Sequence, residues 1–239
     1  MRAAVPMART LRQCPDNPAV LILLPPSEGK TSPQTGAPCD LTTLSFSEHL
    51  HAARRKQWQA QPAAVKRAPA SAAHEVYSGV LYAALNYSTL TAAAQRRANA
   101  SIVIISALFG AVRPTDAIPA YKATMSNTVW RAPVAAALAQ EAGTGLVVDC
   151  RSSTYAGVFT PTAQSTVALR VFKQTGRSRT AITHMSKHYR GLAARHLCST
   201  RRTARSPIDV AQMLSQQWTC ELHEPAGSSP WLLDIIVTT

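Results

Sequence analysis

The chain of 239 residues is long enough for one large domain or two small ones, and a single compact unit is the simpler interpretation. Its 25 Lys and Arg residues outnumber its 12 Asp and Glu residues, so we expect an anionic partner such as nucleic acid, nucleotides or an acidic membrane face. Short apolar runs broken by proline exclude a membrane-spanning helix and predict a soluble protein. The 5 cysteines form no Cys-x-x-Cys pair, which predicts a reducing cytoplasm and no structural zinc.

The first 19 residues carry Arg2, Arg9 and Arg12 with Asp16 as their acid, a composition that resembles a targeting peptide. The apolar stretch after them continues directly into a strand that bears a motif, so cleavage there would destroy the fold. We therefore interpret residues 1–19 as a loose N-terminal extension, or as a start codon set too early, and assign residues 20–239 to one domain.

The first predicted strand, Val20–Leu24, runs into Pro-Pro-Ser-Glu-Gly-Lys-Thr, whose end looks like a phosphate-binding P-loop. A P-loop needs a glycine where Leu24 stands. The two prolines also remove backbone N–H donors from the supposed phosphate cradle. We reject the P-loop and expect a rigid loop that presents Ser27, Glu28 and Lys30.

Residues 47–75 are rich in basic side chains and histidines but have no clean apolar stripe. We expect a mobile basic segment or a poorly packed helix here, with Trp58 as its main apolar anchor, and little contribution to the core.

Short β-rich runs alternate with Ala-rich helical stretches, which predicts a single compact α+β domain with a mixed β-sheet flanked by helices. The other predicted strands are Ile102–Ala107, Leu146–Asp149, Val167–Phe172, Thr180–His184 and Leu232–Val237. The predicted helices are Val76–Leu85, Thr91–Asn99, Pro133–Ala142, Ser186–Leu197 and Pro207–Trp218, the last with Ser206 as its N-cap. A hairpin turn is expected at Gln174–Arg179.

Three predicted strands lead directly into polar loops, after Leu24, Ile105 and Val148. If these strands are parallel, the loops open at the carboxyl edge of the sheet, where open α/β sheets bind ligands. The side chains expected to converge there in a basic cleft are Ser27, Lys30, Arg113, Arg151 and Ser152.

Five motifs follow one another along the chain. They are L-I-L-L-P-P-S-E-G-K-T (21–31), V-Y-S-G-V-L-Y (76–82), S-A-L-F-G-A-V-R-P-T-D-A-I-P-A-Y (106–121), V-V-D-C-R-S-S-T-Y (147–155) and H-M-S-K-H-Y-R-G-L-A-A-R (184–195). In these motifs the chain resembles the YaaA peroxide-stress family, specifically its actinobacterial-type branch, from Leu21 to Val237. The resemblance implies a single-domain α+β fold with a basic cleft, binding to DNA, and a role in limiting hydrogen peroxide damage by restraining reactive iron.

The chain departs from this family between the Leu-Ser-Phe of residues 44–46 and the Val-Tyr-x-Gly motif. Family members have a longer segment there, with a helix-hairpin-helix-like element suited to gripping DNA. Here only Ser47–Glu75 fills the interval, without a glycine for a hairpin turn, and this weakens the expectation of DNA binding. Met125 and Trp130 keep family positions, whereas Lys122 stands where the family has Arg.

In the predicted helix Ser186–Leu197, Lys187, Arg190, Gly191 and Ala194 share one face. The glycine would let an anion or another backbone approach closely, and a solvated basic face is the alternative.

Pro114 keeps Arg113 extended and so directs its side chain. The guanidinium suits a bidentate phosphate or carboxylate contact. An ion pair with Asp116 or Asp149 is the alternative.

Tyr77, Tyr121 and Tyr155 could stack on a base or donate to a phosphate, or could be core tyrosines. Cys150 lies beside Arg151, which would favour a reactive thiolate, although most cysteines are inert core residues. The histidines have no ligand spacing, so no metal site and no cofactor are expected.

Two functions remain open. The first is a cytoplasmic peroxide-stress protein that binds DNA or another nucleic acid in a basic cleft. The second is an enzyme acting on a small anionic nucleotide- or nucleobase-like substrate, with Lys30, Cys150 and Tyr155 as candidate catalytic residues. We favour the binding protein. The candidate binding residues are Ser27, Lys30, Tyr77, Arg113, Tyr121, Arg151, Ser152, Lys187, Arg190 and Arg195. Like-charge crowding by Arg113 and Lys187 is expected to lower the pKa of Lys30.

Overall fold

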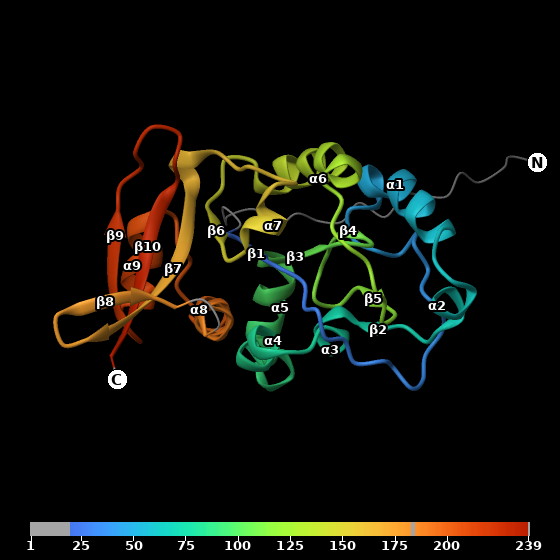
Figure 1. Cartoon of the computed structure of the whole chain (residues 1–239), viewed down its shortest axis with the longest axis horizontal. Helices are drawn as coiled ribbons and strands as arrows, with labels where there is room; N and C mark the ends of the chain where they lie inside the picture. Colours follow the sequence, from blue (N-terminus) through green and yellow to red (C-terminus); the bar gives the residue numbers. More distant parts are fainter. Residues whose placement is uncertain (1–19, 183–184, 239) are drawn as a thin grey trace, which may run out of the picture.

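Figure 1 shows the computed structural model, which describes residues 20–182 and 185–238. The expectations for residues 1–19, and for the end of the predicted strand Thr180–His184, lie outside the described residues.

Eight strands within the described residues form one mixed sheet (Figure 1). Their order is β4-β3-β1-β6-β7-β10-β9, and β8 pairs with β7. The strands are β1 (Leu21–Leu24), β3 (Ile102–Ser106), β4 (Gly110–Val112), β6 (Val147–Asp149), β7 (Thr166–Thr175), β8 (Ser178–Ala181), β9 (Thr219–His223) and β10 (Trp231–Thr238). Strands β3, β1, β6, β7 and β10 run parallel, whereas β4, β8 and β9 are antiparallel to their neighbours. The parallel arrangement on which the convergence of the three loops depends is therefore confirmed.

The central strands are apolar on both sides because helices cover both faces of the sheet. Leu21 and Leu23 of β1 belong to a core cluster with Trp130 of helix α6 (Asn127–Ala142). Ile22 and Leu24 belong to the cluster of the opposite face. Helices α4 (Val80–Leu85), α5 (Ala92–Ser101) and α8 (Ser186–Ser199) contribute to that second cluster (Figure 1). The molecule is a single compact α+β domain, as expected.

Further helices, turns and a second sheet complete the described part of the chain. They are the helices α1 (Ser47–Gln59), α2 (Ala63–Arg67), α3 (Ala73–Val76), α7 (Ser153–Ala156) and α9 (Pro207–Leu214), the 3-10 turns Tyr87–Thr89 and Ala163–Ser165, and a second sheet of β2 (Ser71–Ala72) and β5 (Ala117–Ile118). The predicted helix Val76–Leu85 divides into α3 and α4 near Gly79, whose φ is +104°. The predicted N-cap is confirmed, since Ser206 and Asp209 form a capping box.

Helix α8 packs directly on α4, and Gly191 makes this contact possible. A Cβ atom at Gly191 would lie 2.2 Å from the carbonyl oxygen of Leu81. Of the two partners that we considered for this glycine, an anion or another backbone, the structure has the backbone.

For helix α1, the interpretation of residues 47–75 as poorly packed is wrong. Leu50 and Arg54 of α1 are both fully buried. The Arg54 guanidinium donates to the carbonyl oxygens of Phe109 at 2.9 Å and Ala111 at 2.6 Å, which belong to the edge strand β4 and the turn before it. Trp58 packs 5.8 Å from the Phe109 ring. An arginine in a core position interrupts the apolar stripe, and this is why the pattern was misread.

Candidate functional site

A pocket of about 440 Å³ opens at the carboxyl edge of the parallel strands. Its walls come from the loops after β1, β3 and β6 and from the segment after β5, so the three polar loops do meet. The lining residues are Pro26, Ser27, Glu28, Lys30, Ala107, Tyr121, Lys122, Ala123, Thr124 and Tyr155. Four of the predicted site residues therefore lie together here: Ser27, Lys30, Tyr121 and Tyr155.

Lys30 is held in place by its backbone and by its side chain. The backbones of Lys30 and Tyr77 pair as an isolated β-bridge, which joins the first two motifs. Lys30 Nζ donates to the carbonyl oxygen of Ser27 at 2.9 Å and lies 3.5 Å from that of Glu28. The same nitrogen is 4.4 Å from the ring centroid of Tyr121, a cation–π distance. These contacts fix the amine at the pocket wall.

The pKa of Lys30 is lowered by burial, an effect that the nearby Glu28 carboxylate partly offsets. The direction agrees with our prediction, but the cause differs. We attributed the shift to Arg113 and Lys187, and neither contributes to it. Removal of the ammonium from water lowers the pKa instead.

Below the pocket, Tyr121 joins a buried chain of hydroxyl groups. Its Oη lies 2.9 Å from Tyr77 Oη and 2.8 Å from Ser106 Oγ, which accepts a hydrogen bond from the Phe109 amide at 3.0 Å. Burial raises the pKa of Tyr121 to about 12 and that of Tyr77 well above its ordinary value. Both tyrosines therefore stay protonated. Tyr77 is a core residue with a satisfied hydroxyl, the alternative that we kept open.

Tyr155 of α7 closes the opposite part of the pocket wall. It is half-buried, and burial together with the negative charge of Glu28 raises its pKa. Tyr155 therefore stays protonated and lines the same pocket as Lys30.

Lys122 and Thr124 also line the pocket but were not among the predicted site residues. The available signal was their position directly after the third motif, which ends at Tyr121. Lys122 is exposed to solvent.

Arg113 lies far from this pocket, against expectation. The chain reverses after β3, and antiparallel β4 brings Arg113 back to the amino edge of the sheet. Its side chain pairs with Glu141 and donates to the carbonyl oxygen of Ile102 at 3.1 Å. An ion pair was the alternative that we considered, although Asp116 accepts from the Arg113 backbone amide and not from its guanidinium.

Arg151 is engaged within the loop after β6. It forms a bidentate ion pair with Asp149 and donates to the carbonyl oxygen of Phe159 at 2.9 Å. Ser152 is the N-cap residue of α7, and no side-chain capping bond is formed there. Neither residue lines the pocket, although both lie at the same edge of the sheet.

The basic residues of α8 divide into two groups. Arg190 donates to the carbonyl oxygens of Arg151 at 3.0 Å and Leu169 at 3.2 Å. Arg195 donates to two carbonyl oxygens at the end of α4, at 2.9 and 2.7 Å. Lys187 is exposed, in agreement with the alternative of a solvated basic face. The two arginines thus connect backbone segments.

The structure favours the inert core cysteine that we kept as the alternative for Cys150. The residue is 0% exposed, and burial raises the pKa of its thiol to about 12, although Arg190 opposes the shift. Desolvation of the thiolate outweighs the nearby positive charge.

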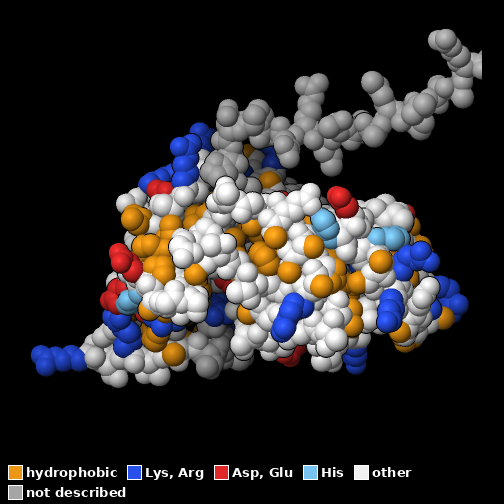
Figure 2. All heavy atoms as spheres, turned by 90° about the horizontal axis from the view of Figure 1, so that it is seen from above, with side chains coloured by type: hydrophobic (Ala, Val, Ile, Leu, Met, Phe, Trp, Pro, Cys, Tyr) orange, Lys and Arg blue, Asp and Glu red, His pale blue; other side chains and the backbone are white. Residues whose placement is uncertain are grey.

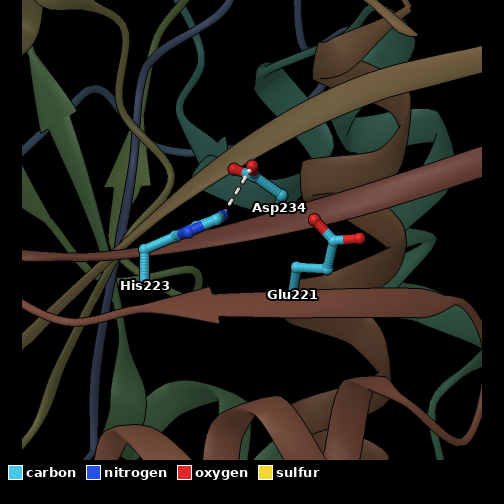
Figure 3. Close-up of side chains that lie close together, drawn as sticks. All are labelled: Glu221, His223 and Asp234. Carbon is cyan, nitrogen blue, oxygen red and sulfur yellow. Dashed lines mark hydrogen bonds and ion pairs between the residues drawn. The ribbon is translucent and has the colours of Figure 1, made fainter. Parts of the chain in front are cut away.

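Figure 3 shows a cluster of Glu221, His223 and Asp234 on β9 and β10, whose ligand atoms all lie within 4.8 Å of one another. Asp234 accepts from Arg170 at 2.6 and 2.8 Å and lies 3.0 Å from His223. Glu221 forms a bidentate pair with Arg179 at 2.6 and 2.9 Å. Both carboxylates are saturated by guanidinium groups, which a metal ion would have to displace.

On the face that Figure 2 draws, Lys and Arg side chains are scattered between the two ends of the molecule, with uncharged surface between them. A search of the described residues finds no helix with the length and apolar character that crossing a membrane requires.

Comparison with known proteins places the chain in a family. Residues 34–221 match the family model described as "Peroxide stress protein YaaA". A UPF0246 protein of Streptomyces coelicolor is 34% identical over 259 residues, covering 91% of this chain and 98% of that protein. A UPF0246 protein of Corynebacterium efficiens is 34% identical over 243 residues, covering 86% and 96%. Because matched actinobacterial relatives extend over nearly their whole length, the chain belongs to the YaaA peroxide-stress family.

Proposed function

We propose that this YaaA-family protein acts in the cytoplasm during peroxide stress by holding one nucleotide unit, free or within a DNA strand, in the pocket around Lys30. Binding of this kind would limit iron-dependent damage by shielding the bound nucleic acid. Membership of the peroxide-stress family supports the cellular context. The free state of the described cysteines, Cys39, Cys150, Cys198 and Cys220, supports a reducing compartment.

The observation that carries the proposal is the composition of the pocket wall. Lys30 and Lys122 offer positive charge for a phosphate, and Tyr155 offers a hydroxyl group for its oxygens. Tyr155, which is half-buried, offers aromatic surface for a base. The volume of about 440 Å³ lies in the usual range of small-ligand sites and fits a single nucleotide unit better than a duplex.

The proposed binding site contains fewer basic side chains than the basic cleft that we expected from the sequence. Arg113, Arg151, Arg190 and Arg195 satisfy carboxylates and backbone carbonyls within the fold. Removing any of them from these partners to reach a phosphate would leave buried polar groups unpaired. The ligand is therefore recognised by the lysines of the pocket.

The test compares the wild type with Lys30→Gln and Lys122→Gln in binding assays at low salt. The probes are deoxyadenosine monophosphate, a single-stranded oligonucleotide and a duplex. We expect each substitution to weaken binding of the single strand about tenfold, which corresponds to about 1.4 kcal/mol. Lys173→Gln is the matched control, because Lys173 is exposed on β7 and does not line the pocket.

Equal losses in the control and in the pocket variants would contradict the proposal, as would a failure of the wild type to bind any probe. Binding of the mononucleotide as tightly as the strand would identify a free nucleotide as the ligand. Binding of the strand alone would identify DNA.

A further inference from the structure

We propose that a cavity between α5, α8 and α9 binds a small carboxylic acid with an apolar body. The wall of this α5–α8 cavity includes Val20, Arg97, Leu197, Arg202 and Met213, and its volume is about 290 Å³. It lies at the amino ends of β1 and β3, whereas the Lys30 pocket lies at the carboxyl edge of the same sheet. The inference is therefore independent of the proposed nucleotide site.

Much of the cavity wall is apolar. Val20 and Ile22 come from the start of β1, Leu197 comes from α8 and Met213 comes from α9. The Cys198 thiol adds to this surface, because burial raises its pKa to about 12 and keeps it uncharged at neutral pH. Such a wall favours an apolar ligand body, since binding removes apolar surface from water.

Two arginines bring positive charge to the same wall. Arg97 belongs to α5 and is half-buried, and Arg202 belongs to the loop after α8 and is exposed. No Asp or Glu is among the described residues that line the cavity. The ligand that fits this combination has an apolar body and an anionic head.

Each guanidinium uses only part of its hydrogen-bonding capacity within the fold. Arg97 donates through Nε and Nη2 to two carbonyl oxygens at the end of α8, at 2.8 and 3.1 Å. Arg202 donates through Nη2 to Asp209 and Gln212. Within the described part of the chain, Nη1 of either arginine has no acceptor. A planar guanidinium edge with unused N–H groups suits the two oxygens of a carboxylate.

A carboxylate that accepts from the Nη1 groups leaves every one of these internal bonds in place. The arginines can therefore bind an anion without leaving a buried polar group unpaired. The volume lies near the lower end of the usual range of small-ligand sites, so a compact aryl or short alkyl acid fits better than a long-chain lipid.

The test titrates the full chain with naphthoate, which has a flat apolar body and one carboxylate, and with naphthamide, its uncharged analogue. Calorimetry measures affinity, and backbone NMR locates the site. We expect naphthoate to bind at least about tenfold more tightly than naphthamide. The amide shifts that move should cluster at residues 97–101 and 197–204.

Two matched pairs of variants test the two parts of the cavity. Arg202→Gln should weaken naphthoate binding about tenfold, whereas Arg201→Gln changes an exposed neighbour outside the wall and should not. Ala100→Trp places a large side chain at the cavity and should abolish binding. Ala93→Trp, at an exposed position of the same helix that does not line the cavity, should bind like the wild type. Thermal unfolding of each variant checks that the fold is retained.

Naphthamide that binds as tightly as naphthoate would overturn the proposal, because the arginines would then not recognise the carboxylate. Equal losses in Arg202→Gln and Arg201→Gln would also overturn it. So would a wild type that binds no naphthoate, or shifts confined to the residues of the Lys30 pocket.

Discussion

Lys30 and Cys150 were both predicted from their neighbours in the sequence, and burial decides the outcome for each. Burial lowers the pKa of the lysine and raises that of the thiol, because in each case the charged form is the one that loses water. For the amine, the neutral form is the nucleophile. For the thiol, the neutral form is inert. The same physical effect therefore supports Lys30 as a candidate and weakens the case for Cys150.

The raised pKa of Cys150, about 12, gives a prediction for thiol labelling. In the native protein at pH 8 the residue should stay protonated and unmodified by a thiol-reactive disulfide, since the pH lies well below the folded pKa. Full labelling should require unfolding. Cys220 is half-buried and should react earlier than Cys150. Rapid labelling of native Cys150, located by peptide mass spectrometry, would contradict its burial.

At the scale of elements, strands that form continuous apolar runs were predictable and short or interrupted elements were not. Strands β1, β3, β6, β7 and β10 lie where the pattern predicts them. The two-residue strands β2 and β5 are too short for a periodic signal. The pocket was predictable because the loops that line it follow parallel strands, whose carboxyl ends meet at one edge of the sheet.

The position of Arg113 could not be predicted, because the chain reverses tightly between β3 and β4 and hydrophobic periodicity does not reveal such a reversal.

Helix α1 illustrates how a charged residue can belong to the core. The β4 edge of the sheet leaves carbonyl groups that need hydrogen-bond donors. Arg54 supplies several donors from one side chain, and burial lowers its pKa to about 10, still above neutral pH. The guanidinium therefore remains charged while it satisfies the edge.

Arg54→Met should destabilise the fold by about 3 kcal/mol. The carbonyl oxygens of Ala111 and Ser45 lose the guanidinium donor that lies 2.6 and 2.7 Å away, and a buried carbonyl left without a donor costs about 1–3 kcal/mol. The free energy of unfolding from urea titration measures this loss. Arg55→Met is the control: the neighbouring residue is exposed, and we expect a change within about 0.5 kcal/mol. Similar values for the two variants would mean that Arg54 does not hold α1 against the sheet.

At the scale of the whole molecule, the net charge is larger than the positive charge that is free to contact a ligand. The chain has a formal charge of +13, yet several arginines are bound to internal partners. A count of basic residues thus overstates the charge that can meet a ligand. The lysines of one pocket carry the recognition that we propose.

The most direct measurement is backbone NMR of the isotope-labelled protein titrated with a single-stranded oligonucleotide. If the Lys30 pocket is the binding site, the amide shifts that move should cluster at residues 27–30, 107, 121–124 and 155, which come from four separate segments of the chain. The exposed basic residues of α1 and α2 should stay unchanged. Shifts confined to α1, α2 or the β8 hairpin, with the pocket silent, would show that nucleic acid binds elsewhere.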